Sequence, residues 1–280
     1  MVASQVALIT GGTDGIGLQV AYRLARGGAQ LVLIGRSIEK GEKAVRDLRA
    51  AVPSVEVRFQ PFDLSCMREV ERLADWVRAN LPKLDLLVHC AGVMLPRRIL
   101  TAEGLETVFA VQYIARFYLT QRLLDHLNAN ARVITVSAGG MFNFQIDFGN
   151  LNGEKYYNGV IALIHESLAN DLLALMFNDR YPAVKTSCYG PFYVRTTLLR
   201  EMPAVLRFFA GTFGRLMAIT PEQAADDVVA LLASDLPGGL YGRKLKPAKV
   251  SRYKRDPAVR ARLWTTTESL IQQAVHVQPV

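Results

Sequence analysis

Short runs of aliphatic and β-branched residues alternate with helical patterns along the first two-thirds of the chain. The strand-like runs are continuously apolar, as in parallel strands that are buried on both faces. Strands that alternate with helices form a parallel sheet between two helical layers, and right-handed crossovers make that sheet doubly wound. We therefore predict an α/β fold with a three-layer, doubly wound parallel sheet. The expected strands are 6–10, 30–35, 55–60, 84–92, 131–137 and 183–190, and the expected helices are 15–27, 38–51, 67–80, 102–128, 158–178, 220–234 and 256–274.

The length and composition suit one large domain. The chain has 280 residues, of which half are apolar, so a sizeable core can form without disulfides or metals. We find no internal repeat and no low-complexity linker, and we expect a single domain over 1–280. Two segments stand apart within it, an apolar segment at 198–217 and a basic segment at 243–262.

A glycine-rich turn directly joins the first strand to the first helix. Gly11 permits a tight turn, Gly15 lets the backbone approach a pyrophosphate, and Gly17 lets the helix pack closely on the sheet. The phosphates would then meet the free N–H groups at the N-terminus of that helix. This context predicts a dinucleotide site. The turn reads Thr10, Gly11, Gly12, Thr13, Asp14, Gly15, Ile16 and Gly17.

The end of the second strand indicates which dinucleotide is bound. An acidic residue at this place would bind the ribose 2′-hydroxyl of NAD. This chain has Arg36 after Gly35, and a guanidinium suits a 2′-phosphate. We therefore expect NADP(H), with a surface arginine as the alternative interpretation.

At this point the chain resembles the short-chain dehydrogenase/reductase family, in which the first turn reads TGxxxGxG. The resemblance continues at Asp63 and Leu64, like the pair beside the adenine ring, and at Ala91 and Gly92, like the end of the family's NNAG motif. It covers essentially the whole chain and is strongest to the branch of retinol-dehydrogenase-like reductases. It implies a Rossmann fold, and it places the apolar segment 198–217 where the family carries a substrate lid.

The residues that the family uses for proton transfer are replaced. The family's asparagine on the fourth helix corresponds to Gln112, and its serine after the fifth strand corresponds to Ala138, although Ser137 precedes it. The tyrosine and lysine of its Tyr-xxx-Lys pair correspond to Leu163 and Ser167. Hydride transfer without a proton partner leaves an unstabilised oxyanion. The resemblance therefore implies a nucleotide site without the family's catalytic groups.

The conclusion that the helix lacks a lysine does not depend on this alignment. No lysine lies between Tyr156 and Arg180, so the helix supplies none in any register. Tyr156 and Tyr157 have Val160 and Ile161 four residues later, so neither has a cationic neighbour on its helix face. A phenol without such a neighbour keeps a pKa near ~10 and is a poor acid–base group at neutral pH.

The motif after the sixth strand is altered as well. Pro191 matches the family motif, but Phe192 stands where the family has glycine, and its ring is expected to narrow or fill the nicotinamide end of the cleft. Thr196 matches the family's threonine that contacts the carboxamide. The adenosine half of the site is thus kept, and the reactive half is altered.

Three functions remain open on the sequence alone. The first is a catalytically inactive, NADP(H)-binding protein that acts as a structural or accessory subunit of a larger assembly. The second is a divergent NADP(H)-dependent oxidoreductase for a retinoid-like or lipid-like carbonyl or alcohol, with its proton supplied by a rearranged group. The candidate groups are His165, Glu166, Tyr156, Tyr157 and Tyr193, with Ser137 to hold a carbonyl. The third is nucleic-acid binding, but no recognised nucleic-acid motif supports it.

Charge and cysteine usage bear on partners and compartment. The segment 243–262 holds nine basic residues and one acid, which accounts for the whole net charge of +8; it is either a solvated face or a contact for an acidic partner. Together with the apolar segment 198–217, it suggests protein partners or a membrane surface, and the resemblance is compatible with a homodimer.

Three cysteines and four histidines without ligand spacing suggest no metal site and a reducing compartment, the cytoplasm or the mitochondrial matrix. The first strand begins almost at the N-terminus, so we expect no signal or transit peptide.

Overall fold

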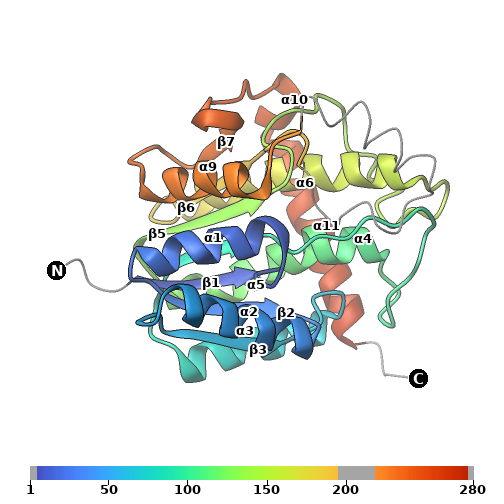
Figure 1. Cartoon of the computed structure of the whole chain (residues 1–280). Coiled ribbons are helices and arrows are strands. Elements are labelled where there is room, and N and C mark those ends of the chain that lie inside the picture. The colour runs from blue at the N-terminus through green and yellow to red at the C-terminus, as the bar shows by residue number, and fades with distance from the viewer. Residues whose placement is uncertain (1–4, 195–217, 277–280) are drawn as a thin grey trace.

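The computed structural model describes residues 5–194 and 218–276. A seven-stranded sheet, all of whose strand pairs are parallel, runs through its centre in the order β3-β2-β1-β4-β5-β6-β7 (Figure 1). The order reverses between β1 and β4, which makes the sheet doubly wound and confirms the predicted fold class. The strands are β1 (Val6–Thr10), β2 (Gln30–Gly35), β3 (Val57–Pro61), β4 (Leu84–His89), β5 (Leu127–Val136), β6 (Lys185–Tyr189) and β7 (Gly239–Tyr241).

Helices cover both faces of this sheet (Figure 1). One apolar layer lies between the sheet and the first group of helices, α1 (Gly15–Arg26), α2 (Ile38–Ala51) and α9 (Pro221–Ala233). The other layer is larger and lies beneath α3 (Met67–Asn80), α4 (Thr107–Phe109), α5 (Ala115–Leu123), α6 (Gly159–Arg180) and α11 (Pro257–His276). The remaining short elements are η1 (Ala110–Ile114), η2 (Leu124–His126), η4 (Arg243–Leu245) and α10 (Arg252–Arg255).

Local sequence signals place most helix ends. Thr220 caps α9 in a reciprocal capping box with Gln223, and Pro221 occupies the first helical position, as expected from the sequence. Ser37 accepts a hydrogen bond from the Lys40 amide and starts α2. These caps explain why the predicted bounds of both helices agree closely with the observed ones.

The predicted helix over 102–128 is wrong at its start and in its regularity. The chain first forms a turn and an isolated bridge between Leu100 and Glu106, and α4 begins only at Thr107. The carboxylate of Glu106 accepts hydrogen bonds from the Val108 and Phe109 amides and so caps α4. A π-helical turn, η1, then separates α4 from α5. Such turns often occur at functional sites, and this one carries Gln112.

By length and composition, α6 is the one helix among the described residues that could cross a membrane. Its mean hydropathy is 1.5, but 61% of the apolar window is buried inside the protein. It packs on the sheet beside α5 (Figure 1), so its apolar character reflects its place in the core.

Candidate functional site

The glycine-rich turn after β1 lies at the carboxyl edge of the sheet, where the strand order reverses. Gly11 and Gly15 both have positive φ angles, +67° and +53°. A Cβ atom on Gly11 would lie 2.6 Å from the Ala91 amide nitrogen, and one on Gly17 would lie only 2.3 Å from the Gly11 carbonyl oxygen. Helix α1 therefore packs directly against the turn, as Gly17 was expected to allow. The arrangement leaves a backbone cradle at the N-terminus of α1, which fits the phosphates of a dinucleotide.

The turn is capped by an acid and approached by a cation. The Asp14 side chain accepts a hydrogen bond from the Gly15 amide at 2.7 Å and starts α1. The Nζ atom of Lys40 lies 3.7 Å from Asp14 Oδ2. Lys40 lies in the first turn of α2, so a second cation lies near the same turn as the exposed Arg36. The sequence analysis did not single out Lys40, because only the fold brings it close to Asp14.

The other expected cofactor residues lie along the same carboxyl edge. Asp63 follows β3 and accepts hydrogen bonds from the Ser65 amide and hydroxyl, and Leu64 beside it is buried. Ala91 and the exposed Gly92 follow β4, and buried Pro191 follows β6. Thr196 and the lid segment 198–217 lie outside the described residues. The expected residues within the described ranges are thus brought to one edge of the sheet, as a dinucleotide site requires.

A polar layer is buried directly beneath this edge. Four residues at matching positions on adjacent strands face α5 and α6, namely Thr10, His89, Thr135 and Cys188. The Nε2 atom of His89 lies 3.0 Å from the Thr120 hydroxyl on α5. Burial, together with the nearby guanidinium of Arg116, lowers the pKa of His89 to about 3, so the imidazole is neutral.

Arg116 is the buried cation of this layer. Its guanidinium donates to the Ala91 carbonyl at 2.7 Å and to the Val136 carbonyl at 3.2 Å. These carbonyls follow β4 and end β5, so one side chain holds together the two strand ends beneath the cleft. Its side chain is 3% exposed, and burial lowers the pKa of Arg116.

Glu166 supplies the matching buried acid from α6. Its Oε2 atom accepts from Asn170 Nδ2 at 2.6 Å and lies 3.4 Å from the Ser137 hydroxyl. The Ser167 hydroxyl lies 3.3 Å from Oε1 of the same carboxyl. Burial raises the pKa of Glu166 to about 7, because desolvation outweighs the opposing effect of Arg116 and these hydrogen bonds.

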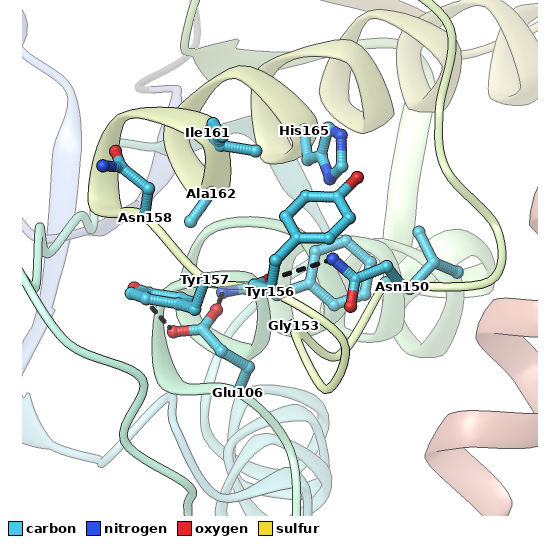
Figure 2. Close-up of a pocket in the computed structure, with 11 residues that line it drawn as sticks. Glu106, Asn150, Gly153, Tyr156, Tyr157, Asn158, Ile161, Ala162 and His165 are labelled. Atoms are coloured by element: carbon cyan, nitrogen blue, oxygen red, sulfur yellow. Dashed lines mark hydrogen bonds between the residues drawn. The ribbon is translucent and has the colours of Figure 1, made fainter.

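A small pocket opens on a different side of α6. Figure 2 shows Tyr156 beside His165, and the Tyr157 hydroxyl donating to Glu106. Its α6 lining residues include Ile161 and His165, which lie about half a turn from 163 and 167 at ~100° per residue. The full lining is Glu106, Phe109, Asn150, Leu151, Gly153, Tyr156, Tyr157, Asn158, Ile161, Ala162 and His165.

Comparison with known proteins places this geometry in a family. Residues 5–148, just over half of the chain, match the family model described as short chain dehydrogenase. The chain belongs to the short-chain dehydrogenase family. It is 33% identical to retinol dehydrogenase 12 of Bos taurus, over 95% of this chain and 86% of the relative. It is 34% identical to polyprenol dehydrogenase of Mus musculus, over 93% and 82%.

Solved structures agree with the fold. An alcohol dehydrogenase of the archaeon Thermococcus sibiricus, complexed with 5-hydroxy-NADP, superposes with a TM-score of 0.65. The match covers 90% of this chain and 99% of that chain at 23% identity.

The structure places the four residues that the sequence analysis assigned to the family's acid–base positions, and that assignment stays a prediction. Gln112 is buried in the π-turn η1, and its backbone carbonyl accepts from Asn170 Nδ2 at 2.8 Å. Ala138 is buried after β5. Leu163 and Ser167 lie on one face of α6, and the Ser167 hydroxyl lies 3.4 Å from that of Ser137. None of these four side chains is a tyrosine or a lysine.

The structure separates the candidate proton donors proposed above. Tyr156, Tyr157 and His165 line the small pocket, on a different side of α6 from Leu163 and Ser167. The Glu166 carboxyl, in contrast, accepts from the Ser137 hydroxyl at 3.4 Å. Tyr193 lies in the loop after β6.

Phe192 adopts a conformation that favours glycine. Its φ angle is +71°, which an L side chain rarely adopts, and this explains why the family has glycine at the position. Its side chain is 58% exposed. The ring lies largely exposed after β6, and its expected narrowing or filling of the nicotinamide end of the cleft stays a prediction.

The interpretation of 243–262 as one solvated basic face is wrong in part. Lys254 is 1% exposed, and its Nζ atom lies 2.8 Å from Asp171 Oδ2 in an equally buried ion pair. Arg260 pairs with Asp179, and Arg243 lies 3.6 Å from Asp227. A usable signal was Asp171 itself, because an acid inside an apolar helix needs a buried partner.

Proposed function

We propose that this chain is a catalytically inactive short-chain dehydrogenase that binds NADP(H) and acts as an accessory subunit of a larger assembly. The turn after β1 would hold the pyrophosphate, and Arg36 with Lys40 would bind the 2′-phosphate. When bound, NADP(H) supplies or accepts a hydride at its nicotinamide. The residues around that end of the cleft would exclude water but supply no tyrosine hydroxyl to carry the matching proton.

One observation supports the proposed inactivity. The face of α6 that should carry tyrosine and lysine has Leu163 and Ser167, and the Ser167 hydroxyl contacts Ser137 and Glu166. Lys254 is the one lysine that is buried among the described residues. It is bound to Asp171, which lies one helical turn after Ser167 on α6. An ammonium held in a buried ion pair is not available to lower the pKa of a catalytic hydroxyl.

The test compares turnover with a restored site. The purified chain is incubated with NADPH and a panel of retinoid, polyprenal and short aliphatic carbonyls, and NADPH consumption is followed by absorbance. We expect no turnover above the background rate. A variant with Ala138→Ser, Leu163→Tyr and Ser167→Lys should gain activity by at least about 100-fold, since positioned acid–base groups contribute about 10²–10⁴-fold. Turnover by the unmodified chain would refute inactivity.

Glu166 supports a second candidate, a divergent oxidoreductase for an apolar carbonyl or alcohol. Its carboxyl lies 3.4 Å from the Ser137 hydroxyl, and its pKa of about 7 suits proton exchange near neutral pH. In carbonyl reduction Ser137 would donate its proton to the substrate oxygen and take a proton from Glu166, and in alcohol oxidation the protons would move the opposite way. If the unmodified chain turns over, the Glu166→Gln variant distinguishes this route, because it should abolish turnover while NADPH binding is retained.

The free cysteines bear on the compartment, and native purification tests the accessory role. The three cysteines are free, with Cys188 buried and Cys66 and Cys90 half-buried, which fits a reducing compartment such as the cytoplasm or the mitochondrial matrix. Native purification should recover the chain with partner proteins in fixed ratio. Recovery of the chain alone, at the mass of a monomer or homodimer, would contradict an accessory role.

A further inference from the structure

The loop that follows β5 rests against the basic segment. A Cβ atom on Gly140 would lie 2.4 Å from Ala248 Cβ. The Lys254 ammonium donates to the Phe142 carbonyl at 2.6 Å, and the Tyr253 hydroxyl accepts from the Ile146 amide at 3.0 Å. The loop 140–146 and the segment 244–255 therefore form one continuous surface, near α10 and β7 in Figure 1.

A buried ion pair fixes these two segments to the core. Asp171 on α6 binds Lys254 through Oδ2 and accepts from the Gly140 amide through Oδ1 at 2.9 Å. Because Lys254 also binds the Phe142 carbonyl, one buried pair holds the loop, α10 and α6 together. Side chains on the outside of the two segments are thus presented at fixed positions.

The outer side of this surface is both apolar and basic. Phe144 and Met141 at the tip of the loop are 59% and 41% exposed. Five basic side chains of the adjoining segment are also exposed, and none has a salt bridge with another residue in the described ranges. They are Lys244, Lys246, Lys249, Arg252 and Arg255. We call these seven residues the basic–apolar face.

We propose that the basic–apolar face docks this protein onto an anionic lipid bilayer. Lysines and arginines beside a membrane gain electrostatic attraction to anionic headgroups, while exposed Phe and Met side chains insert among them. All seven side chains are exposed, and the basic ones have no salt bridge within the described ranges, so the charge complement that this face offers is to a surface of many anionic groups. The inference is independent of the proposed function, because it uses neither the nucleotide turn nor the α6 positions.

The test measures binding of the full chain to lipid vesicles without nucleotide. The probes are phosphatidylcholine vesicles and vesicles containing ~30% phosphatidylserine, assayed by flotation at about 0.1 and 0.5 M NaCl. We expect binding to the anionic vesicles alone, and its loss at high salt, since screening shortens the reach of surface charges. Replacing Lys246 and Lys249 by Glu should weaken binding by at least about 25-fold, because each removed charge contributes about fivefold.

Matched variants separate the membrane from other partners. Phe144→Ser with Met141→Ser should also weaken vesicle binding, whereas Ile38→Ser, which changes an apolar side chain of similar exposure on α2, should not. Lys83→Glu, at an exposed lysine before β4, controls for net charge. Binding to soluble polyglutamate but not to vesicles would overturn the proposal in favour of an acidic polypeptide partner. Vesicle binding that survives the Lys246→Glu and Lys249→Glu changes would overturn it as well.

Discussion

Glu166 is held in its position although its charge is poorly accommodated there. Its side chain is 2% exposed, and the Arg116 guanidinium that could balance it instead donates to the Ala91 and Val136 carbonyls. Asn170, Ser137 and Ser167 surround the carboxyl with neutral hydrogen-bonding groups. A neutral carboxylic acid suits such an environment better than a carboxylate does.

The stability of the fold should therefore depend on the ionisation of Glu166. Burial raises its pKa from 4.5 to about 7. Between these values the unfolded chain releases the proton and the folded chain retains it, so the free energy of unfolding falls as pH rises. Relative to the Glu166→Gln variant, the wild-type chain should lose about 2–3 kcal/mol between pH 5 and pH 8.

Urea unfolding of both proteins at pH 5, 6, 7 and 8 measures this difference. The Glu56→Gln variant, changed at an exposed carboxyl, controls for the loss of one charge. A wild-type chain that gains stability relative to Glu166→Gln as pH rises would show that Arg116 stabilises the carboxylate more than burial destabilises it.

Among the helices and strands, α6 carries the residues on which the proposed loss of activity depends. The resemblance to the family assigns its tyrosine and lysine positions to Leu163 and Ser167, and the neighbouring Glu166, Asn170 and Asp171 are buried together with Ser167. Asp171 binds Lys254 from the C-terminal segment. This side of the helix is thus joined to the rest of the chain through a buried ion pair.

Breaking the buried ion pair should destabilise the fold strongly. Lys254→Met leaves Asp171 buried without its cation, which typically costs about 3–5 kcal/mol. Adding Asp171→Leu removes the uncompensated charge, and the double variant should recover most of that loss, less the hydrogen bond to the Gly140 amide. Urea unfolding measures both, with Lys249→Met as the control for an exposed lysine on the same segment. Equal losses in the single and double variants would show that packing, and not charge, sets the cost.

Sequence patterns predicted the elements well and their side-chain partners poorly. The glycine turn, the α9 capping box and the strand order depend on local chemistry and chirality, which a sequence displays directly. The pairing of Lys254 with Asp171 joins residues far apart in the chain, and a run of basic residues gives no sign of which one is buried. The start of α4 was missed because Glu106 caps it through its side chain, an uncommon choice at a position where Asp, Asn, Ser and Thr lead.

At the scale of the whole molecule, the two halves of the cleft have different constraints. The adenosine half depends on glycines whose Cβ atoms would collide with backbone, so a change there would disturb the sheet edge itself. The reactive half depends on side chains that can change without moving a strand. Loss of catalytic groups is therefore compatible with a fully retained fold, and ligand binding to the adenosine half should still stabilise the entire domain.

Thermal stability measures that linkage and the choice of dinucleotide together. A ligand at about 100 times its Kd adds about 2.7 kcal/mol, which for a domain of this size raises Tm by roughly 5 °C or more. We expect NADPH to produce this shift and NADH to produce a much smaller one, because NADH offers no 2′-phosphate to Arg36. In Arg36→Ala, which keeps Lys40, the NADPH shift should fall towards the NADH value, while Arg58→Ala, changed at an exposed arginine on β3, should keep it. Equal shifts from both dinucleotides in the wild-type chain would show that Arg36 is an ordinary surface residue and that the site does not select the phosphate.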